Sequence, residues 1–179
     1  MKSINLENIS IRALAEFIGK HLSKHGIDVV LVGGACVSIY TKNKYLSDDL
    51  DFITYETNKK IKFALKEIGF EYDRKKYYVH PECKFFLEFL TPPVAVGNEP
   101  IQTFNEISSS FGQIKILSPT DCVKDRLAAY IHWDDKQSLE QAIMVTRDQI
   151  VDVNEIKRWA KKEVNGNKKI TEFLKNLEV

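Results

Sequence analysis

The stretch from Val29 to Phe52, VVLVGGACVSIYTKNKYLSDDLDF, sets a glycine pair and a group of aspartates beside apolar segments. Asp48, Asp49 and Asp51 fall within four positions. Carboxylates this close repel one another, and the repulsion costs stability. The runs IDVVLV and LDFIT are apolar and β-branched, which is typical of buried strands. The sequence thus concentrates negative charge beside the expected core, and this placement indicates a function.

Strand alternation predicts which side chains share a face. Asp49 and Asp51 are two residues apart and should point the same way, while Leu50 and Phe52 point the other way. Two carboxylates on one face supply the hard oxygen ligands that Mg²⁺ or Mn²⁺ binds. Glu88 interrupts a further apolar run, KFFLEFL, where an unpaired carboxylate is costly. We therefore expect Asp49, Asp51 and Glu88 to form a divalent-metal centre suited to phosphoryl transfer.

Gly33 and Gly34 separate the first strand from a short helix expected at ACVSIY. Glycine lets the backbone approach a ligand closely, and a helix N-terminus favours anionic phosphate. Ser47, two residues before Asp49, could donate its hydroxyl to the same phosphates. A glycine pair alone often only ends a strand, and paired aspartates also occur at strand edges and in capping clusters. The combination of the two features favours a phosphate and metal site.

The rest of the chain predicts an α+β fold. Helical spacing over residues 11–22 precedes the first strand, and Thr57 can cap a helix that ends at Gly69. Further strands are expected at KYYVH and KFFLEFL, paired as a hairpin, and at IQTFNEI and GQIKIL, with TPPVAVGNEP as a loop. Ser118 can cap a helix, and helical spacing continues from it over 119–132, 136–148, 153–164 and 167–177. We expect a mixed-sheet α/β core over 1–117, packed against an all-helical region over 118–179.

Composition excludes several function classes. The net charge of +1 gives no overall attraction to nucleic acid or membrane, and no apolar run approaches the ~18 residues of a membrane span. The N-terminus has no apolar signal-peptide core. Three separated cysteines favour free thiols in a cytoplasmic protein. The histidines at 21, 25, 80 and 132 are interpreted as structural or surface residues without ligand spacing, and Trp133 and Trp159 as packing between helices.

The segments LVGGACVSIY and SDDLDF together resemble the hG[G/S]…DhD signature of the nucleotidyltransferase superfamily, which has the polymerase β-like fold. The separation of Gly34 from Asp49 fits that signature, and Glu88 fits its third carboxylate. SPTDCVKDRLAAY is similar to the helix that follows the catalytic domain in abortive-infection and toxin-type members, where a basic residue meets the triphosphate. The resemblance covers residues 27–135 and leaves Lys124 and Arg126 as candidates, of which Arg126 is favoured because it precedes LAAY.

The resemblance implies an enzyme that transfers a nucleoside monophosphate from a nucleoside triphosphate to a hydroxyl, with release of pyrophosphate. Asp49, Asp51 and Glu88 would be catalytic and would bind Mg²⁺ or Mn²⁺. Nucleotide contacts are expected from Gly33, Gly34, Ser47, Lys124 and Arg126. The acceptor stays open between a small molecule, a tRNA end and a protein hydroxyl. One possible role of such an enzyme is that of a toxin in a toxin–antitoxin or phage-defence system, with a cognate antitoxin as its partner.

Three other functions share individual features with this sequence. A haloacid dehalogenase phosphatase needs an apolar strand directly before its first aspartate, whereas KYLSD precedes it here. A calcium loop needs a glycine at its sixth position, and none follows. The stronger alternative is a non-catalytic module of the same fold that binds nucleotide or a partner without turnover. The complete carboxylate set argues against it, because metal ligands are what the chemistry requires.

Overall fold

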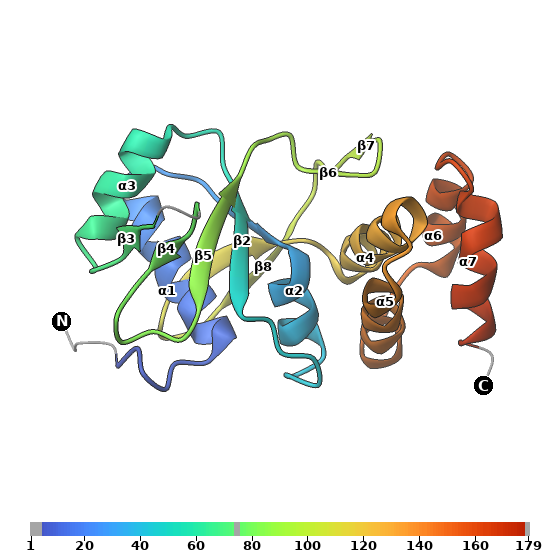
Figure 1. The fold of residues 1–179 in the computed structure, drawn as a ribbon, viewed down its shortest axis with the longest axis horizontal. Coiled ribbons are helices and arrows are strands. Elements are labelled where there is room, and N and C mark those ends of the chain that lie inside the picture. The colour runs from blue at the N-terminus through green and yellow to red at the C-terminus, as the bar shows by residue number, and fades with distance from the viewer. Residues whose placement is uncertain (1–4, 74–75, 178–179) are drawn as a thin grey trace.

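The computed structural model describes residues 5–73 and 76–177 of the 179-residue chain (Figure 1). In this part of the chain the fold is α+β, as predicted, with a mixed sheet followed by helices. None of the helices in these residues is long and apolar enough to cross a membrane.

The centre of the fold is a seven-stranded sheet with strand order β3-β4-β5-β2-β1-β9-β8. Its strands are β1 (Val30–Val32), β2 (Asp49–Ile53), β3 (Glu71–Tyr72), β4 (Tyr78–Val79), β5 (Phe86–Leu90), β8 (Asn105–Ser108) and β9 (Gln113–Ile116). β1 is antiparallel to β2 and parallel to β9, while β2 runs parallel to β5. The sheet is therefore mixed, and the aspartate-bearing strand lies near its middle, between β1 and β5. The expected hairpin of β4 with β5 is confirmed.

One face of the sheet is covered by α1 (Ile11–Lys24) and α3 (Asn58–Lys66), which Figure 1 shows packed beside and behind the strands. The side chains of Leu31, Leu50 and Phe52 are fully buried in this core. Thr57 caps α3 by accepting from the backbone N–H of Lys60, as its position predicts. Because Leu50 and Phe52 point into this core, alternation turns Asp49 and Asp51 to the other face.

α2 (Gly33–Tyr40) begins directly at the end of β1. It packs between the sheet and the helices that follow β9, and the Tyr40 hydroxyl donates to the backbone carbonyl of Leu117 at 2.5 Å. α2 therefore joins the sheet to the helical part of the chain at the point where β1 ends.

The C-terminal helices are α4 (Pro119–Trp133), α5 (Lys136–Asp148), α6 (Val153–Ala160) and α7 (Gly166–Lys175). Ser118 caps α4 and exchanges hydrogen bonds with Asp121, which is the expected capping arrangement. Trp159 is fully buried and donates its indole N–H to the carbonyl of Val96 at 3.1 Å. The prediction that Trp133 packs between helices is wrong, since it stands at the end of α4 and is 77% exposed.

A small hairpin of β6 (Ala95–Val96) and β7 (Glu99–Pro100) lies within the segment that was expected to be a loop. The strand expected at IQTFNEI begins only at Asn105. Residues 101–104 instead run back beside the hairpin, where the N–H of Ile101 donates to the carbonyl of Val94. The hairpin contacts α4, so the segment connects the sheet with the helical region (Figure 1).

Candidate functional site

Three carboxylates converge on the sheet face that α1 and α3 leave uncovered. Asp51 pairs with Glu88 across the parallel strands β2 and β5, and Asp49 precedes Asp51 by two residues on the same face. One carboxylate oxygen from each residue lies within 4.8 Å of the others. All three side chains are partly buried. Residues that are far apart in the chain thus form one compact group of oxygen ligands.

The electrostatics of this group favour a cation. Burial of Asp51, followed by repulsion from Asp49 and Glu88, raises the pKa of Asp51 to about 7. The charge of Arg126 acts in the opposite direction and lowers the pKa of Asp51. A divalent cation would neutralise the repulsion, and hard oxygen ligands at this spacing suit Mg²⁺ or Mn²⁺. The residues present therefore fit the metal centre that the sequence predicts.

The glycine pair lies against this group. Gly33 has a left-handed φ of +71°, and a Cβ built on it would lie 2.2 Å from Asp51 Oδ2. A Cβ on Gly34 would lie 2.8 Å from the Ser47 hydroxyl oxygen. Both positions thus leave no room for a side chain, and Gly33 also needs the backbone freedom of glycine. The N-terminus of α2 is held next to the carboxylates, where a phosphate bound to them would meet it.

Ser47 positions an aspartate in this structure. Its hydroxyl donates to Asp49 Oδ1 at 2.8 Å, and its backbone N–H donates to the Ser38 hydroxyl at 2.9 Å. Ser47 is buried, so the hydroxyl fixes the Asp49 carboxylate from inside the protein. Asp48, in contrast, is exposed, and its backbone carbonyl accepts from the N–H of Phe86.

The two basic candidates on α4 have different surroundings. Lys124 is only 2% exposed, and its Nζ lies 2.9 Å from Asp121, 3.2 Å from Glu155 and 3.7 Å from Glu99. Its charge is therefore already surrounded by carboxylates on the side of the β6–β7 hairpin. This placement suits a residue that holds the hairpin, α4 and α6 together.

Arg126 lies on the side of the carboxylate group. Its guanidinium donates to Asp125 Oδ2 at 2.5 Å and to the Gln141 side-chain oxygen at 3.4 Å. Its charge acts on Asp51 and also on the buried thiol of Cys36 in α2. Arg126 is thus the candidate cation whose charge reaches the carboxylate group, and its guanidinium pairs with Asp125 and Gln141.

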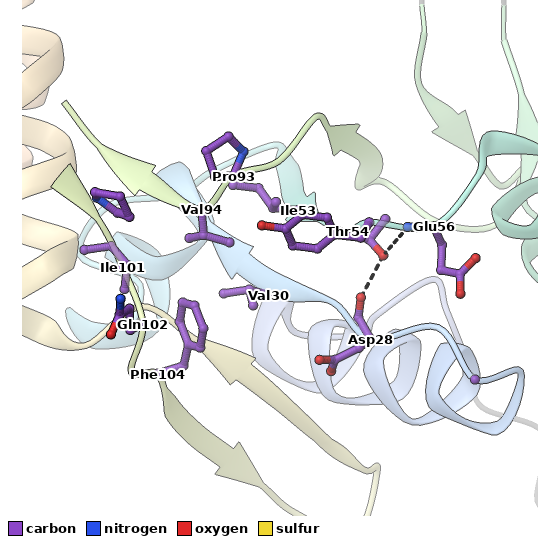
Figure 2. A pocket seen from close by; sticks show the side chains of 13 residues that line it. Asp28, Val30, Ile53, Thr54, Glu56, Pro93, Val94, Ile101, Gln102 and Phe104 are labelled. Carbon is purple, nitrogen blue, oxygen red and sulfur yellow. Dashed lines mark hydrogen bonds between the residues drawn. The ribbon is translucent and has the colours of Figure 1, made fainter. Parts of the chain in front are cut away.

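A hollow of about 420 Å³ continues along the same sheet face. Val30 pairs with Ile53 in the register where Val32 pairs with Asp51, so two lining residues of the hollow lie two positions along β1 and β2 from the Val32–Asp51 pair, while the three carboxylates themselves do not line it. Figure 2 shows Val30 and Ile53 on its floor, with Val94, Ile101 and Phe104 around it. No local sequence pattern predicts this hollow, because its lining comes from three separate segments.

The interpretation that the histidines have no ligand spacing is wrong for one pair. His21 and His25 lie four residues apart at the end of α1, and each brings a ring nitrogen within 4.8 Å of the other and of a Glu67 carboxylate oxygen. Spacing of four on a helix is itself a recognisable ligand signal. His80 and His132 belong to no such group in the described part of the chain.

Comparisons with known proteins found one family match and similar folds among solved structures. Residues 10–76 match a family described as "Nucleotidyl transferase of unknown function (DUF2204)". The fold is similar to that of an antigenic nucleotidyltransferase-like protein from Paracoccidioides brasiliensis, with 14% identity, a TM-score of 0.63, and coverage of 96% of this chain and 88% of that one. The antibiotic-resistance factor ANT(2'')-Ia is 10% identical with a TM-score of 0.48, over 76% of this chain and 82% of its own. No curated protein matches the sequence.

Proposed function

We propose that this chain is a nucleotidyltransferase, which transfers a nucleoside monophosphate from a nucleoside triphosphate to a hydroxyl group. The observation that carries the proposal is the convergence of Asp49, Asp51 and Glu88 within 4.8 Å, next to the glycine turn at Gly33. In the reaction the acceptor oxygen bonds to the α-phosphorus, the bond from that phosphorus to the bridging oxygen breaks, and pyrophosphate leaves.

The carboxylates would hold two divalent cations, which supply charge neutralisation for the attacking and leaving oxygens when bound. Asp49 and Asp51 are the proposed ligands, and Ser47 keeps the Asp49 carboxylate in place through its 2.8 Å hydrogen bond. Glu88 completes the group and is the proposed acceptor of the proton from the attacking hydroxyl. Backbone N–H groups at the start of α2 face the same region and would bind phosphate oxygens.

Arg126 is the proposed partner of the triphosphate. The leaving pyrophosphate carries negative charge, and the Arg126 guanidinium is the α4 cation that acts electrostatically on Asp51. Gln141 and Asp125 hold the guanidinium in place. Lys124 is assigned a structural role in this proposal, since its amine is already engaged by Asp121, Glu155 and Glu99.

The hollow of Figure 2 is the proposed place for the acceptor. Ile53 lies two residues beyond Asp51 on β2, which is about 7 Å along a strand. A volume of about 420 Å³ suits a small molecule. The acidic side chains at its rim are compensated, since Asp28 pairs with Lys115 and Glu56 with Lys60. The hollow therefore favours an acceptor with an apolar body and a hydroxyl that reaches the carboxylates.

A labelling experiment tests the activity. The protein is incubated with each α-³²P nucleoside triphosphate, Mg²⁺ and a cell extract separated into small-molecule, RNA and protein fractions. We expect label in the small-molecule fraction, and none when Asp49→Asn replaces the wild type. Label in tRNA or protein would move the acceptor away from the hollow. Nucleotide binding without any transfer would support the non-catalytic alternative. Growth arrest on expression, relieved by a neighbouring gene product, would identify a toxin with its antitoxin.

A further inference from the structure

We propose that His21, His25 and Glu67 form a Zn²⁺ site that joins α1 to α3 on the helix-covered side of the sheet. This site is separate from the carboxylate group, because α1 and α3 pack on the face opposite Asp49 and Asp51. It also does not depend on the proposed nucleotidyl transfer, since none of its residues contacts the carboxylate group.

The three side chains already lie at the spacing that one metal ion needs. A ligand atom from each residue lies within 4.8 Å of the other two. His25 Nε2 is 3.1 Å from Glu67 Oε2, and the ring centroids of His21 and His25 are 4.9 Å apart. A tetrahedral ion with bonds of about 2.0–2.2 Å separates its ligand atoms by roughly 3.3–3.5 Å, so only small side-chain movements would complete the site.

The hydrogen bond of His21 selects the tautomer of its neutral ring. Nε2 of His21 lies 2.7 Å from the backbone carbonyl oxygen of Ala64 in α3. A carbonyl only accepts, so Nε2 carries the proton and the other nitrogen of the neutral ring keeps its lone pair. Metal-binding histidines are commonly oriented by this kind of bond to a backbone carbonyl. The contact therefore holds the ring in the state that binds metal.

The donor set selects the metal. Two imidazoles and one carboxylate form a ligand set typical of zinc, with a fourth position left for water. His21 and His25 are partly buried and Glu67 is exposed, so water and ions can reach the group. An ion bound here would connect the last turn of α1 to the C-terminal end of α3, and it would stabilise the packing of both helices on the sheet.

The test uses a parent protein in which two other candidate zinc ligands, Asp49 and Cys83, have been replaced. Asp49→Asn weakens the carboxylate group, and Cys83→Ser removes a partly buried thiol. Zinc affinity is measured by competition with a chromophoric chelator, and thermal unfolding is followed with and without Zn²⁺. We expect the parent to bind one equivalent of Zn²⁺ and to gain thermal stability from it.

His25→Gln and Glu67→Gln in this parent should each weaken zinc binding by at least about tenfold and abolish the thermal gain. His132→Gln is the matched control, because His132 also pairs with a glutamate, Glu163, at 2.9 Å but has no second histidine beside it. Glutamine keeps the size of the side chain and a hydrogen-bonding group, so all three variants should fold. Failure of the parent to bind Zn²⁺, or equal binding by the parent and by both site variants, would overturn the proposal and leave His25 and Glu67 as a simple ion pair.

Discussion

The backbone of Gly33 lies against the carboxylate of Asp51, and a Cβ at position 33 would come within 2.2 Å of Asp51 Oδ2. Gly33, which directly follows β1, therefore limits the position of the Asp51 carboxylate, a proposed metal ligand on β2. We expect Gly33→Ala to reduce nucleotidyl transfer by about 10²-fold, because the displaced carboxylate loses its geometry. It should also lower the free energy of unfolding by about 1 kcal/mol or more through the left-handed φ.

Gly69→Ala is the control for Gly33→Ala. Gly69 also has a positive φ, of +83°, and its Cβ would clash with the ring of His80 at 2.6 Å, outside the carboxylate group. Urea unfolding should show a loss of stability in both variants, whereas transfer assays on folded protein should show a loss of activity only in Gly33→Ala. Equal transfer activity in the two variants would contradict a role of the Gly33–Asp51 contact in catalysis.

Asp51→Asn should reduce transfer by at least about 10²–10³-fold, because it removes charge from the proposed metal-binding group while keeping the side-chain shape. Asp48→Asn makes the same chemical change at the exposed neighbour and should leave the activity unchanged. Activity is measured as transfer of ³²P label, and circular dichroism checks that both variants fold. Wild-type rates in Asp51→Asn would refute the metal centre.

Arg126→Gln should lower kcat/KM for the nucleoside triphosphate by about 10²-fold, because the leaving pyrophosphate loses a cationic partner. Lys124→Gln should act on stability instead. The Lys124→Gln variant leaves the carboxylates of Asp121, Glu155 and Glu99 without the buried cation that they share. Loss of one partner from a buried ion pair lowers the free energy of unfolding by about 3 kcal/mol. Steady-state kinetics and urea unfolding on both variants separate the two roles. Unchanged kinetics in the Arg126→Gln variant would show that Arg126 on α4 does not contribute to triphosphate binding.

Filling the hollow should affect the acceptor and spare the nucleotide. Ile101→Trp places a larger side chain at the wall of the hollow shown in Figure 2. We expect the yield of labelled product from the extract to fall by about tenfold or more, with unchanged binding of a fluorescent nucleoside triphosphate. Val164→Trp adds the same side chain at an exposed position and serves as control. Full product yield from Ile101→Trp would place the acceptor elsewhere.

The β6–β7 hairpin should loosen in acid. A hydrogen bond from Arg158 is the main cause that lowers the pKa of Glu99 to about 2. Burial raises this pKa, and a second hydrogen bond, from Lys162, lowers it further. A carboxylate whose pKa is depressed by folding contributes stability above its unfolded value of about 4.5 and loses that stability as the pH falls through about 2. Urea unfolding between pH 7 and pH 2 should therefore show a loss in the wild type, of roughly 1 kcal/mol, that is absent from Glu99→Gln. If the free energy of unfolding fell in parallel with pH in the two proteins, the proposed contribution of Glu99 to stability would be contradicted.

Features that depend on local spacing could be predicted from the amino-acid sequence alone. Alternation along β2 predicted that Asp49 and Asp51 share a face, and the buried partners Leu50 and Phe52 confirm it. The caps at Thr57 and Ser118 were also readable, since a cap bonds to a backbone N–H only three residues away. These properties follow from the periods of strands and helices, so they need no knowledge of distant contacts.

Tertiary structure alone decided which distant residues meet. The pairing of Asp51 with Glu88 depends on β5 lying parallel to β2. The different surroundings of Lys124 and Arg126 depend on which elements pack against each side of α4. The hollow likewise combines separate segments, and so does the meeting of Glu67 with His21 and His25, although the spacing of four between the two histidines is visible in the sequence. Such contacts are set by the burial of apolar surface over the whole fold, which is non-directional and leaves no signature in the spacing of a few residues.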